Sequence, residues 1–366
     1  MFDNIVEKDN KLSFDVNDVD LSLVNALRRI IIAEVQSIAF AFDPNVKEND
    51  LKVKINTGSL HNEFLCHRIS LIPLHFSKEE FENFQSSKYN FVLKKKNTSE
   101  QMLKVTTADF EIFDETGKKY PDEFLERILP ANKFTNDHIL ITKLKPNMFD
   151  KSKGDEIHIE GQPSIGSGRL HARWTPVSLC TFFNILDDNS VQKGLEEYIK
   201  QNRDTSLDEQ ELRARFNTLE VHRFFKKNKF MEPSSFRFEL ETECGFECKQ
   251  IFKMAMNVLI EKLKTFISNL QENNKILVSQ SQGMTYITVD NEDHTLGNVV
   301  QSMLYNIYIR ETDDTELKYI GYYKPHPLED NVIIKVKTDK DPIKLIQNGC
   351  TKIIDIIQDM IVQWNV

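Results

Sequence analysis

The sequence lacks a cysteine framework. Five cysteines occur among 366 residues, and their odd number and wide spacing do not fit paired disulfides. Free thiols are typical of a reducing compartment. Cys244 and Cys248 could supply half of a metal site, but a structural zinc needs about four ligands. Because no second cysteine or histidine pair is spaced to complete such a site, we predict that the chain binds no metal.

Long apolar runs are also missing. No stretch approaches the ~18 apolar residues that a membrane-spanning helix needs. No apolar run follows a basic start near residue 1, so the pattern of a secretory signal peptide is absent. We therefore expect an intracellular protein with no membrane span.

Acidic residues outnumber basic ones, at 56 Asp and Glu against 47 Lys and Arg. The formal net charge is −9 and the isoelectric point is about 5.6. Proteins that grip a nucleic-acid backbone are usually basic, because their affinity comes from neutralising phosphates. Two local basic segments, at 94–96 and 222–227, are interpreted as solvated surface in this acidic chain. We expect no direct, specific binding of nucleic acid.

The chain has no recognisable catalytic motif. It contains no phosphate-binding loop of the Walker type, no His-Glu-x-x-His helix and no nucleophile elbow. No clustered acidic triplet is present that could hold catalytic magnesium. Gly166 and Gly168 form a short glycine pair that is too weak a signal for nucleotide binding. We predict neither catalytic residues nor a cofactor.

The sequence does contain an internal repeat. Its first copy starts with Leu12, Phe14 and Val16, which alternate with polar residues as in a half-buried strand. Asp20 and Ser22 are typical of a helix N-terminus. One apolar helix face follows, formed by Leu23, Ala26, Leu27, Ile30 and Ile31. A second alternating run covers residues 51–55.

The second copy repeats this pattern from residue 284. A strand-like run precedes Asp293, and residues 293–298 match residues 20–25 as Asp-x-Ser/Thr-Leu-x-Asn. The apolar helix positions recur at Leu296, Val299, Val300, Met303 and Leu304. Another strand-like run covers residues 332–336.

Both copies end in a long amphipathic helix. In the first copy a strand at 236–240 precedes a helix over about 251–270, and in the second the helix covers about 343–361. One small sheet with one helix buries little apolar surface alone, so two copies are expected to pack about a pseudo-two-fold axis. The predicted interface comprises Leu23, Leu27, Ile30, Leu259, Leu296, Val300, Met303 and Ile354.

These patterns predict an α+β protein with four segments. The first unit comprises residues 1–74 and 236–270, interrupted by an insertion domain at 75–235. A linker at 271–283 joins it to the second unit, 284–366. Such a link would make pairing intramolecular, at an effective concentration on the order of millimolar.

Several motifs of the first copy occur in a fixed order. They are Asn25-Ala26-Leu27-Arg28-Arg29-Ile30, Ala33-Glu34-Val35, Asn56-Thr57-Gly58-Ser59-Leu60, Glu63-Phe64, His67-Arg68, Leu71-Ile72-Pro73-Leu74 and the glycine-rich segment from Gly166 to Val177. They resemble the α-like assembly subunits of multisubunit DNA-directed RNA polymerases. The similarity is to the third-largest subunit of polymerase II, its nuclear and archaeal counterparts, and bacterial α.

The second copy is similar to the small partner of that subunit, the eleventh polymerase II subunit. Two motifs carry this similarity, Glu292-Asp293-His294-Thr295-Leu296-Gly297-Asn298 and Gly321-Tyr322-Tyr323-Lys324-Pro325-His326-Pro327-Leu328-Glu329. The two subunits are normally separate chains. Their head-to-tail fusion resembles the arrangement in large DNA viruses that encode their own transcription apparatus.

The resemblance implies a non-catalytic assembly platform. The fused pair would recruit the second-largest polymerase subunit and then the largest, together with small accessory subunits. The expected partner-binding residues are Asn25, Arg28, Arg29, Glu34, His67 and Arg68. A solvated helix end is the alternative interpretation of the two arginines, and Gly297 is expected to let another backbone approach. The zinc loop of some family members is not carried over, because residues 75–100 contain no cysteine.

The alternative function and the expected location complete the predictions from the sequence. The alternative function is a DNA-binding transcription factor with a dimeric core, which would need a basic recognition element. If the protein is viral, its expected locations are the viral factories of the host cytoplasm and also the virion. The nucleus is the alternative location.

Overall fold

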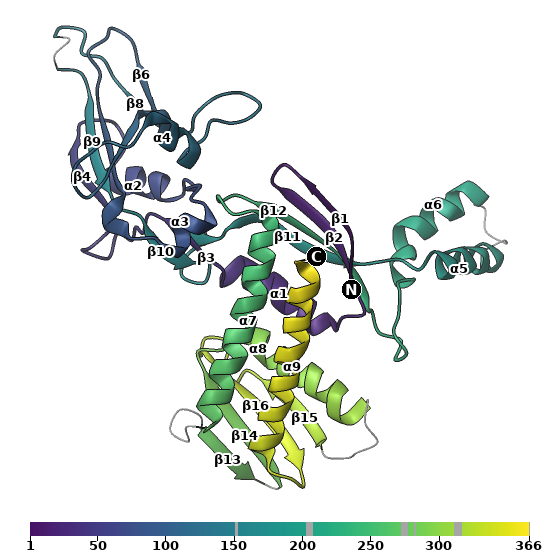
Figure 1. Cartoon of the computed structure of the whole chain (residues 1–366). Helices are drawn as coiled ribbons and strands as arrows, with labels where there is room; N and C mark the ends of the chain where they lie inside the picture. The colour runs from purple at the N-terminus through teal and green to yellow at the C-terminus, as the bar shows by residue number, and fades with distance from the viewer. Residues whose placement is uncertain (151–152, 203–207, 272–276, 282, 311–316, 366) are drawn as a thin grey trace. The chain divides into compact units, whose positions relative to one another are not determined.

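A computed structural model of the chain describes residues 1–366 except 151–152, 203–207, 272–276, 282, 311–316 and 366. The chain divides into two compact units (Figure 1). The paired unit comprises residues 1–31, 179–241 and 252–366, and the inserted unit comprises residues 32–178 and 242–251. This division differs from the predicted boundaries, because the inserted unit already begins at residue 32 and residues 179–235 belong to the paired unit.

The paired unit contains both repeats, and each has two strands, a short helix, two more strands and a long helix. The first repeat comprises β1 (Phe2–Lys8), β2 (Lys11–Asn17), α1 (Leu21–Ala33), β11 (Val177–Asn184), β12 (Ser235–Thr242) and α7 (Cys248–Gln271), some of whose ends pass into the inserted unit. The second comprises β13 (Leu277–Ser281), β14 (Met284–Asp290), α8 (His294–Tyr305), β15 (Leu317–Tyr323), β16 (Asn331–Thr338) and α9 (Pro342–Trp364).

The two sheets have the same strand order. The first is β1-β2-β12-β11 and the second is β13-β14-β16-β15, so each strand of one repeat has a counterpart at the same place in the other. The predicted α+β class is confirmed. The strand-like run at 332–336 lies in β16, whose counterpart in the first sheet is β12, whereas the run at 51–55 lies in β4 of the inserted unit. Alternating apolar and polar residues identify a strand, but its neighbour in the sheet depends on contacts with residues distant in the sequence.

The predicted linker also needs correction. Residues 277–281 form β13, which pairs with β14 from Leu277 opposite Thr288 to Ser281 opposite Met284. Gly283, just before β14, has a φ of 73°, a backbone conformation that glycine adopts at no steric cost. The strand went unpredicted because five residues are too few to show a clear period.

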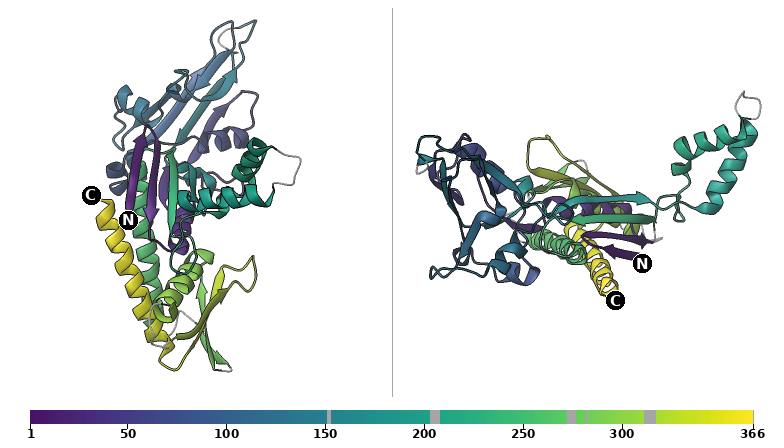
Figure 2. Two further views of the ribbon diagram at one scale, coloured as in Figure 1. Left: turned by 90° about the vertical axis from the view of Figure 1, so that its right-hand side faces the viewer. Right: turned by 90° about the horizontal axis from the view of Figure 1, so that it is seen from above.

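Five aromatic rings form the centre of the first repeat's core. Trp364, in the last turn of α9, lies 4.7 Å from Phe14 and from Phe252 between ring centroids, and 4.9 Å from Phe2. Phe238 stacks on Phe14 at 5.4 Å. The second repeat's long helix therefore completes the first repeat's core, and α7 and α9 run side by side in both views of Figure 2.

A helical hairpin interrupts the first repeat between β11 and β12. It consists of α5 (Asp188–Gln201) and α6 (Glu209–Leu219). Its small core includes Phe216, whose ring centroid is 5.7 Å from that of Tyr198 and 5.5 Å from that of Phe224. The hairpin projects beyond the first sheet (Figures 1 and 2).

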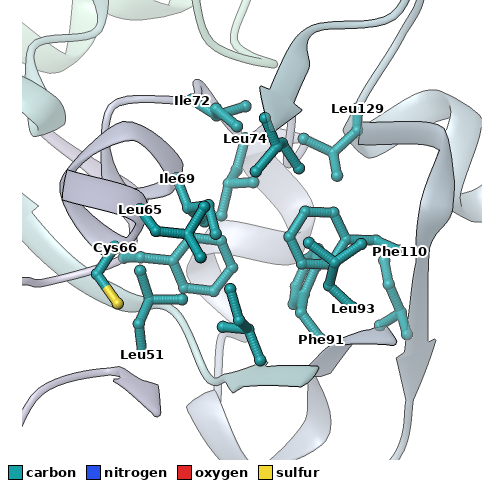
Figure 3. Close-up of a cluster of buried hydrophobic side chains, with 14 of the residues drawn as sticks. Leu51, Leu65, Cys66, Ile69, Ile72, Leu74, Phe91, Leu93, Phe110 and Leu129 are labelled. Atoms are coloured by element: carbon teal, nitrogen blue, oxygen red, sulfur yellow. The ribbon is translucent and has the colours of Figure 1, made fainter. Parts of the chain in front are cut away.

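The inserted unit has its own sheets and core. Its elements are β3 (Gln36–Ala39), β4 (Leu51–Asn56), α2 (Asn62–Ser70), α3 (Lys78–Glu82), β5 (Asn90–Lys96), β6 (Leu103–Thr106), β7 (Phe110–Phe113), α4 (Asp122–Ile128), β8 (Leu140–Leu144), β9 (Glu156–Gly161) and β10 (Ser164–Ser167). One sheet has the order β4-β9-β5-β7, and β6-β8 and β10-β3 form pairs. Figure 3 shows side chains of α2, β4 and β5 meeting in this core.

Two further observations bear on the predicted chemistry. A Cβ atom on Gly166 would lie 2.4 Å from the ring of Trp174, so this glycine makes room for the tryptophan within the inserted unit. Among the described residues, no helix is long and apolar enough to cross a membrane.

Candidate functional site

The short helices α1 and α8 begin with the same cap. Asp20 Oδ1 accepts a hydrogen bond from the Ser22 amide at 2.7 Å, and Asp293 Oδ1 accepts one from the Thr295 amide at 2.7 Å. Each aspartate thereby satisfies an amide that has no partner inside the helix. The repeated Asp-x-Ser/Thr pattern is thus a pair of helix caps.

Each cap also contacts the other helix. Arg29 of α1 donates from Nη2 to Asp293 Oδ2 at 2.8 Å and from Nε to Thr295 Oγ1 at 2.8 Å. In return, Asp20 accepts from Ser302 Oγ at 3.1 Å and from Asn306 Nδ2 at 2.7 Å. The two helices therefore run antiparallel, with the start of each beside a later turn of the other.

These contacts follow a two-fold pattern. Arg29 stands nine residues after Asp20, and Ser302 stands nine residues after Asp293. Equivalent positions on the two helices therefore contact each other's caps, as in an isologous dimer. The symmetry is broken in charge, because one contact is an ion pair and the other joins a carboxylate to neutral donors.

The ion pair changes the acidity of Asp293. Burial alone would raise the pKa of this carboxyl group, but hydrogen bonds from Thr295 and the nearby Arg29 guanidinium outweigh it and lower the pKa to about 2. Asp293 is therefore charged throughout the physiological range.

Further polar contacts join the repeats away from the short helices. Lys262 of α7 lies 2.9 Å from Glu292, and both side chains are less than a fifth exposed. Arg310 donates to both carboxylate oxygens of Glu232, from Nη2 to Oε1 at 2.8 Å, and this pairing lowers the pKa of Glu232. Such bidentate pairs fix orientation as well as adding energy.

The predicted apolar interface residues are all buried. Their exposed fractions range from 0% to 8% for Leu23, Leu27, Ile30, Leu259, Leu296, Val300, Met303 and Ile354. Leu23 and Met303 line one small cavity of about 280 Å³ together with Ile307 and Ile356, so these side chains of the two repeats face each other.

The two predicted docking arginines have different surroundings. Arg29 is held inside the pair by Asp293 and Thr295, so the structure places it in an internal contact rather than on a free surface. Arg28 donates from Nε and Nη2 to Asn25 Oδ1 at 3.2 and 3.1 Å. No carboxylate of the described residues forms an ion pair with Arg28, and its side chain is half-buried.

The remaining predicted partner-binding residues lie in the inserted unit. Glu34 is half-buried in the turn after α1. Arg68 of α2 donates to the carbonyl oxygens of Ile141 at 3.1 Å and Leu140 at 2.8 Å, which secures α2 against β8. His67 is exposed on the same helix. The six predicted residues are therefore divided between the two units.

Gly297 has a different role from the expected one. A Cβ atom at this position would lie 2.6 Å from the ring of Tyr322, so the glycine accommodates a side chain and not a neighbouring backbone.

In the part of the chain that the structure describes, no group of three or more His, Cys, Asp or Glu residues could hold a metal ion. Cys180 is half-buried, and the desolvation of its thiol raises the pKa to about 12.

Sequence reasoning missed the reciprocal contact itself. It recognised Asp20 and Asp293 as caps but gave them no partner across the repeats. The equal nine-residue spacing from each aspartate to Arg29 or Ser302 was the available signal. It becomes informative only when the helices are known to pack antiparallel.

Comparison with known sequences agrees with this geometry. Two sequence families, both described as the RNA polymerase Rpb3/Rpb11 dimerisation domain, match the chain at residues 13–263 and 285–363. The first match runs from β2 into α7 and includes the inserted unit, and the second runs from β14 to α9. The chain belongs to the Rpb3/Rpb11 dimerisation family.

Relatives with assigned names support this membership. The chain is similar to DNA-directed RNA polymerase subunit Rpo3 of Thermococcus kodakarensis, at 24% identity over 74% of this chain and 98% of that protein. It is 27% identical to subunit 3B of RNA polymerases IV and V of Arabidopsis thaliana, over 48% of this chain and 54% of the relative. A conjugation stage-specific protein of Tetrahymena thermophila is 26% identical, over 72% and 92%.

Proposed function

We propose that the chain is an assembly platform of a DNA-directed RNA polymerase, with both α-like partners carried in one polypeptide and already paired. The single observation that carries this proposal is the reciprocal cap contact between two stretches that match the same dimerisation family. Membership of this family makes the chain a non-catalytic polymerase subunit, in line with relatives named as polymerase subunit 3.

The proposed order of assembly begins with the paired unit. The pair forms within one chain, the second-largest polymerase subunit binds it next, and the largest subunit docks afterwards. Arg28 is the proposed docking residue of α1. Asn25 orients its guanidinium group, and no carboxylate of the described chain neutralises it. A planar guanidinium group is suited to bidentate pairing with a partner carboxylate.

We further propose that the fusion arose in a large DNA virus that encodes its own polymerase. This proposal rests on the presence of two family matches in one chain. The corresponding location is the host cytoplasm and the virion, with the nucleus as the alternative.

Co-purification tests the platform. The tagged chain, expressed in its native source, is expected to bring down the two largest polymerase subunits in equal amounts. Arg28→Glu should lower their recovery at least about tenfold, equivalent to about 1.4 kcal/mol of binding free energy, without changing the fold. Arg215→Glu, a charge reversal on exposed α6, is the matched control and should recover both subunits normally.

Two outcomes would contradict the proposal at different levels. Normal recovery with Arg28→Glu would remove Arg28 from the docking surface. Failure of the unmodified chain to recover the two large subunits would overturn the platform itself.

A further inference from the structure

The contact of Arg310 with the first repeat involves four side chains. Its guanidinium group donates to both carboxylate oxygens of Glu232. The guanidinium carbon also lies 4.7 Å from the ring centroid of Phe230 and 4.9 Å from that of Tyr305. We call Phe230, Glu232, Tyr305 and Arg310 the clasp. It joins the two repeats by an ion pair and a cation–π contact.

A π-helical turn carries Arg310 to the first repeat. This turn, Asn306–Arg310, directly follows α8. Such turns are rare and are frequent at functional sites. Both of its ends bind the first repeat, because Asn306 Nδ2 donates to Asp20 Oδ2 at 2.7 Å and Arg310 Nη2 donates to Glu232 Oε1 at 2.8 Å.

The segment that holds Glu232 is ordered by its own hydrogen bonds. Asn228 Oδ1 accepts from the Phe230 amide at 2.8 Å and from the Glu232 amide at 3.1 Å. The Asn228 amide in turn donates to the Glu232 carbonyl at 2.8 Å. A pre-ordered binding segment loses less entropy when its partner docks. The first repeat therefore presents Phe230 and Glu232 in a fixed arrangement.

The ion pair is more informative about partner choice than about stability. The side chain of Arg310 is 23% exposed and that of Glu232 is 46% exposed. Their hydrogen bond is the largest cause that raises the pKa of Arg310 and lowers the pKa of Glu232, so both are charged. Water screens such a partly exposed pair, and its energy is modest. Specificity, however, is a difference between partners, to which a missing or repelling charge also contributes.

The first repeat has no arginine in the equivalent place. Arg310 stands 17 residues after the cap residue Asp293, and the residue 17 after Asp20 is Ser37. Ser37 lies in β3, and its Oγ donates to the Trp174 carbonyl at 2.7 Å. Residues 33–38 contain neither lysine nor arginine. Two first repeats that paired in the same way would therefore leave Glu232 without its cation.

The second repeat has no equivalent of Glu232. This glutamate stands three residues before β12, and the residue three before β16, the counterpart of β12, is Leu328. Leu328 is 89% exposed, and the adjacent Glu329 already accepts from Asn331 Nδ2 at 3.3 Å. By the same count His326 takes the place of Phe230. Two second repeats would therefore bring Arg310 opposite a leucine.

We propose that the clasp is the determinant of partner choice, which makes the second repeat pair with a first repeat and not with a second copy of itself. Only the mixed pair brings Arg310 against Phe230 and Glu232, and each homotypic pair lacks one half of the clasp. The inference deepens the proposed function, because it names the residues that decide which α-like partners are joined.

Native mass spectrometry of the cleaved chain tests the inference. The full chain is folded and then cut at a protease site placed within residues 272–276, so that every element is present but the tether no longer favours the mixed pair. Pairs of two first repeats, of two second repeats and of one of each differ in mass. Glu232→Arg should raise the homotypic share at least about fivefold, because it sets two like charges against each other in the mixed pair alone.

Two further variants separate partner choice from general damage. Arg310→Glu added to Glu232→Arg should return the homotypic share to that of the unmodified chain, because opposite charges face each other again. Glu241→Arg makes the same charge change elsewhere on the first repeat. Since Glu241 pairs with Lys11 of its own repeat at 3.2 Å, this control should leave the share unchanged.

The other outcomes overturn the inference. Glu232→Arg might release single fragments without homotypic pairs, which would show that the clasp stabilises the pair without selecting it. An unchanged share, a share that Arg310→Glu does not restore, or separation of the cleaved unmodified chain would each also refute it. These measurements use the chain alone, so failure to co-purify with the large polymerase subunits overturns the proposed platform separately.

Discussion

Arg28 and Arg29 are neighbours on α1 but have different partners. Arg29 pairs with Asp293 across the two repeats, whereas the Arg28 side chain donates to Asn25 in its own helix. Adjacent residues of a helix point about 100° apart, so one can face the second repeat while the other faces away. At the scale of single residues, α1 therefore uses Arg29 for internal pairing and leaves Arg28 for the docking that we propose.

The Arg29–Asp293 pair should contribute measurably to the stability of the paired unit. Arg29→Ser, Asp293→Asn and the double variant form a cycle whose coupling energy we expect to be about 1 kcal/mol, since both side chains are about a third exposed. Hydrogen exchange of the α1 and α8 amides provides the measurement. Arg28→Ser is the control and should change protection by no more than about 0.5 kcal/mol. A coupling energy near zero would show that the pair only orients the helices.

The same contact should be sensitive to acid. The folded pKa of Asp293 is about 2, below its ordinary value of 3.8, so the stabilising contribution is complete above about pH 4 and is lost as the pH falls towards 2. The stability difference between the unmodified chain and Asp293→Asn should therefore shrink over this range. A difference that stays constant from pH 6 to pH 2.5 would contradict this assignment.

Among the elements, the long helices were easier to predict than the strand pairings. The amphipathic stripes of α7 and α9 are visible in the sequence because apolar residues recur with the helical period over more than 20 residues. The run at 51–55 was recognised as a strand, but β4 belongs to the inserted unit, where it pairs with β9. Sequence period reports local conformation, and pairing depends on contacts between distant residues.

Trp364 shows how one element supports another repeat. Trp364→Ala should destabilise the paired unit by about 3–5 kcal/mol, because it leaves a cavity among Phe2, Phe14 and Phe252. Amides of β2 in the first repeat should lose hydrogen-exchange protection. Val362→Ala is the control, since Val362 is 65% exposed on the same helix. Loss of protection confined to the last turn of α9 would show that the first core does not depend on Trp364.

At the scale of the whole molecule, the repeat was predictable and the division into units was not. The strand, cap and helix patterns revealed two copies, and both now have the same strand order. The boundary at residue 32 could not be predicted, because the inserted unit begins directly after the last apolar residues of α1. The external partner contacts expected at His67 and Glu34 stay predictions.

Pairing should survive without the covalent connection. A protease site placed within residues 272–276 would cut between α7 and β13 and leave both sheets intact. We expect the two fragments to elute together in gel filtration at micromolar concentration, held by the buried interface and the cap contacts. Separate elution would mean that the repeats associate only because they are tethered. An uncut chain carrying the same insertion is the control.

The position of Trp364 has a consequence for synthesis. The rings of Phe2 and Phe14 leave the ribosome early, but the tryptophan that packs between them and Phe252 lies in the last turn of α9. During translation the core of the first sheet, which Phe252 of α7 covers in part, therefore stays incomplete until residue 364 has emerged. A message truncated before that codon would yield a chain with a permanently open core, which chaperones and proteases could recognise before it reached a polymerase.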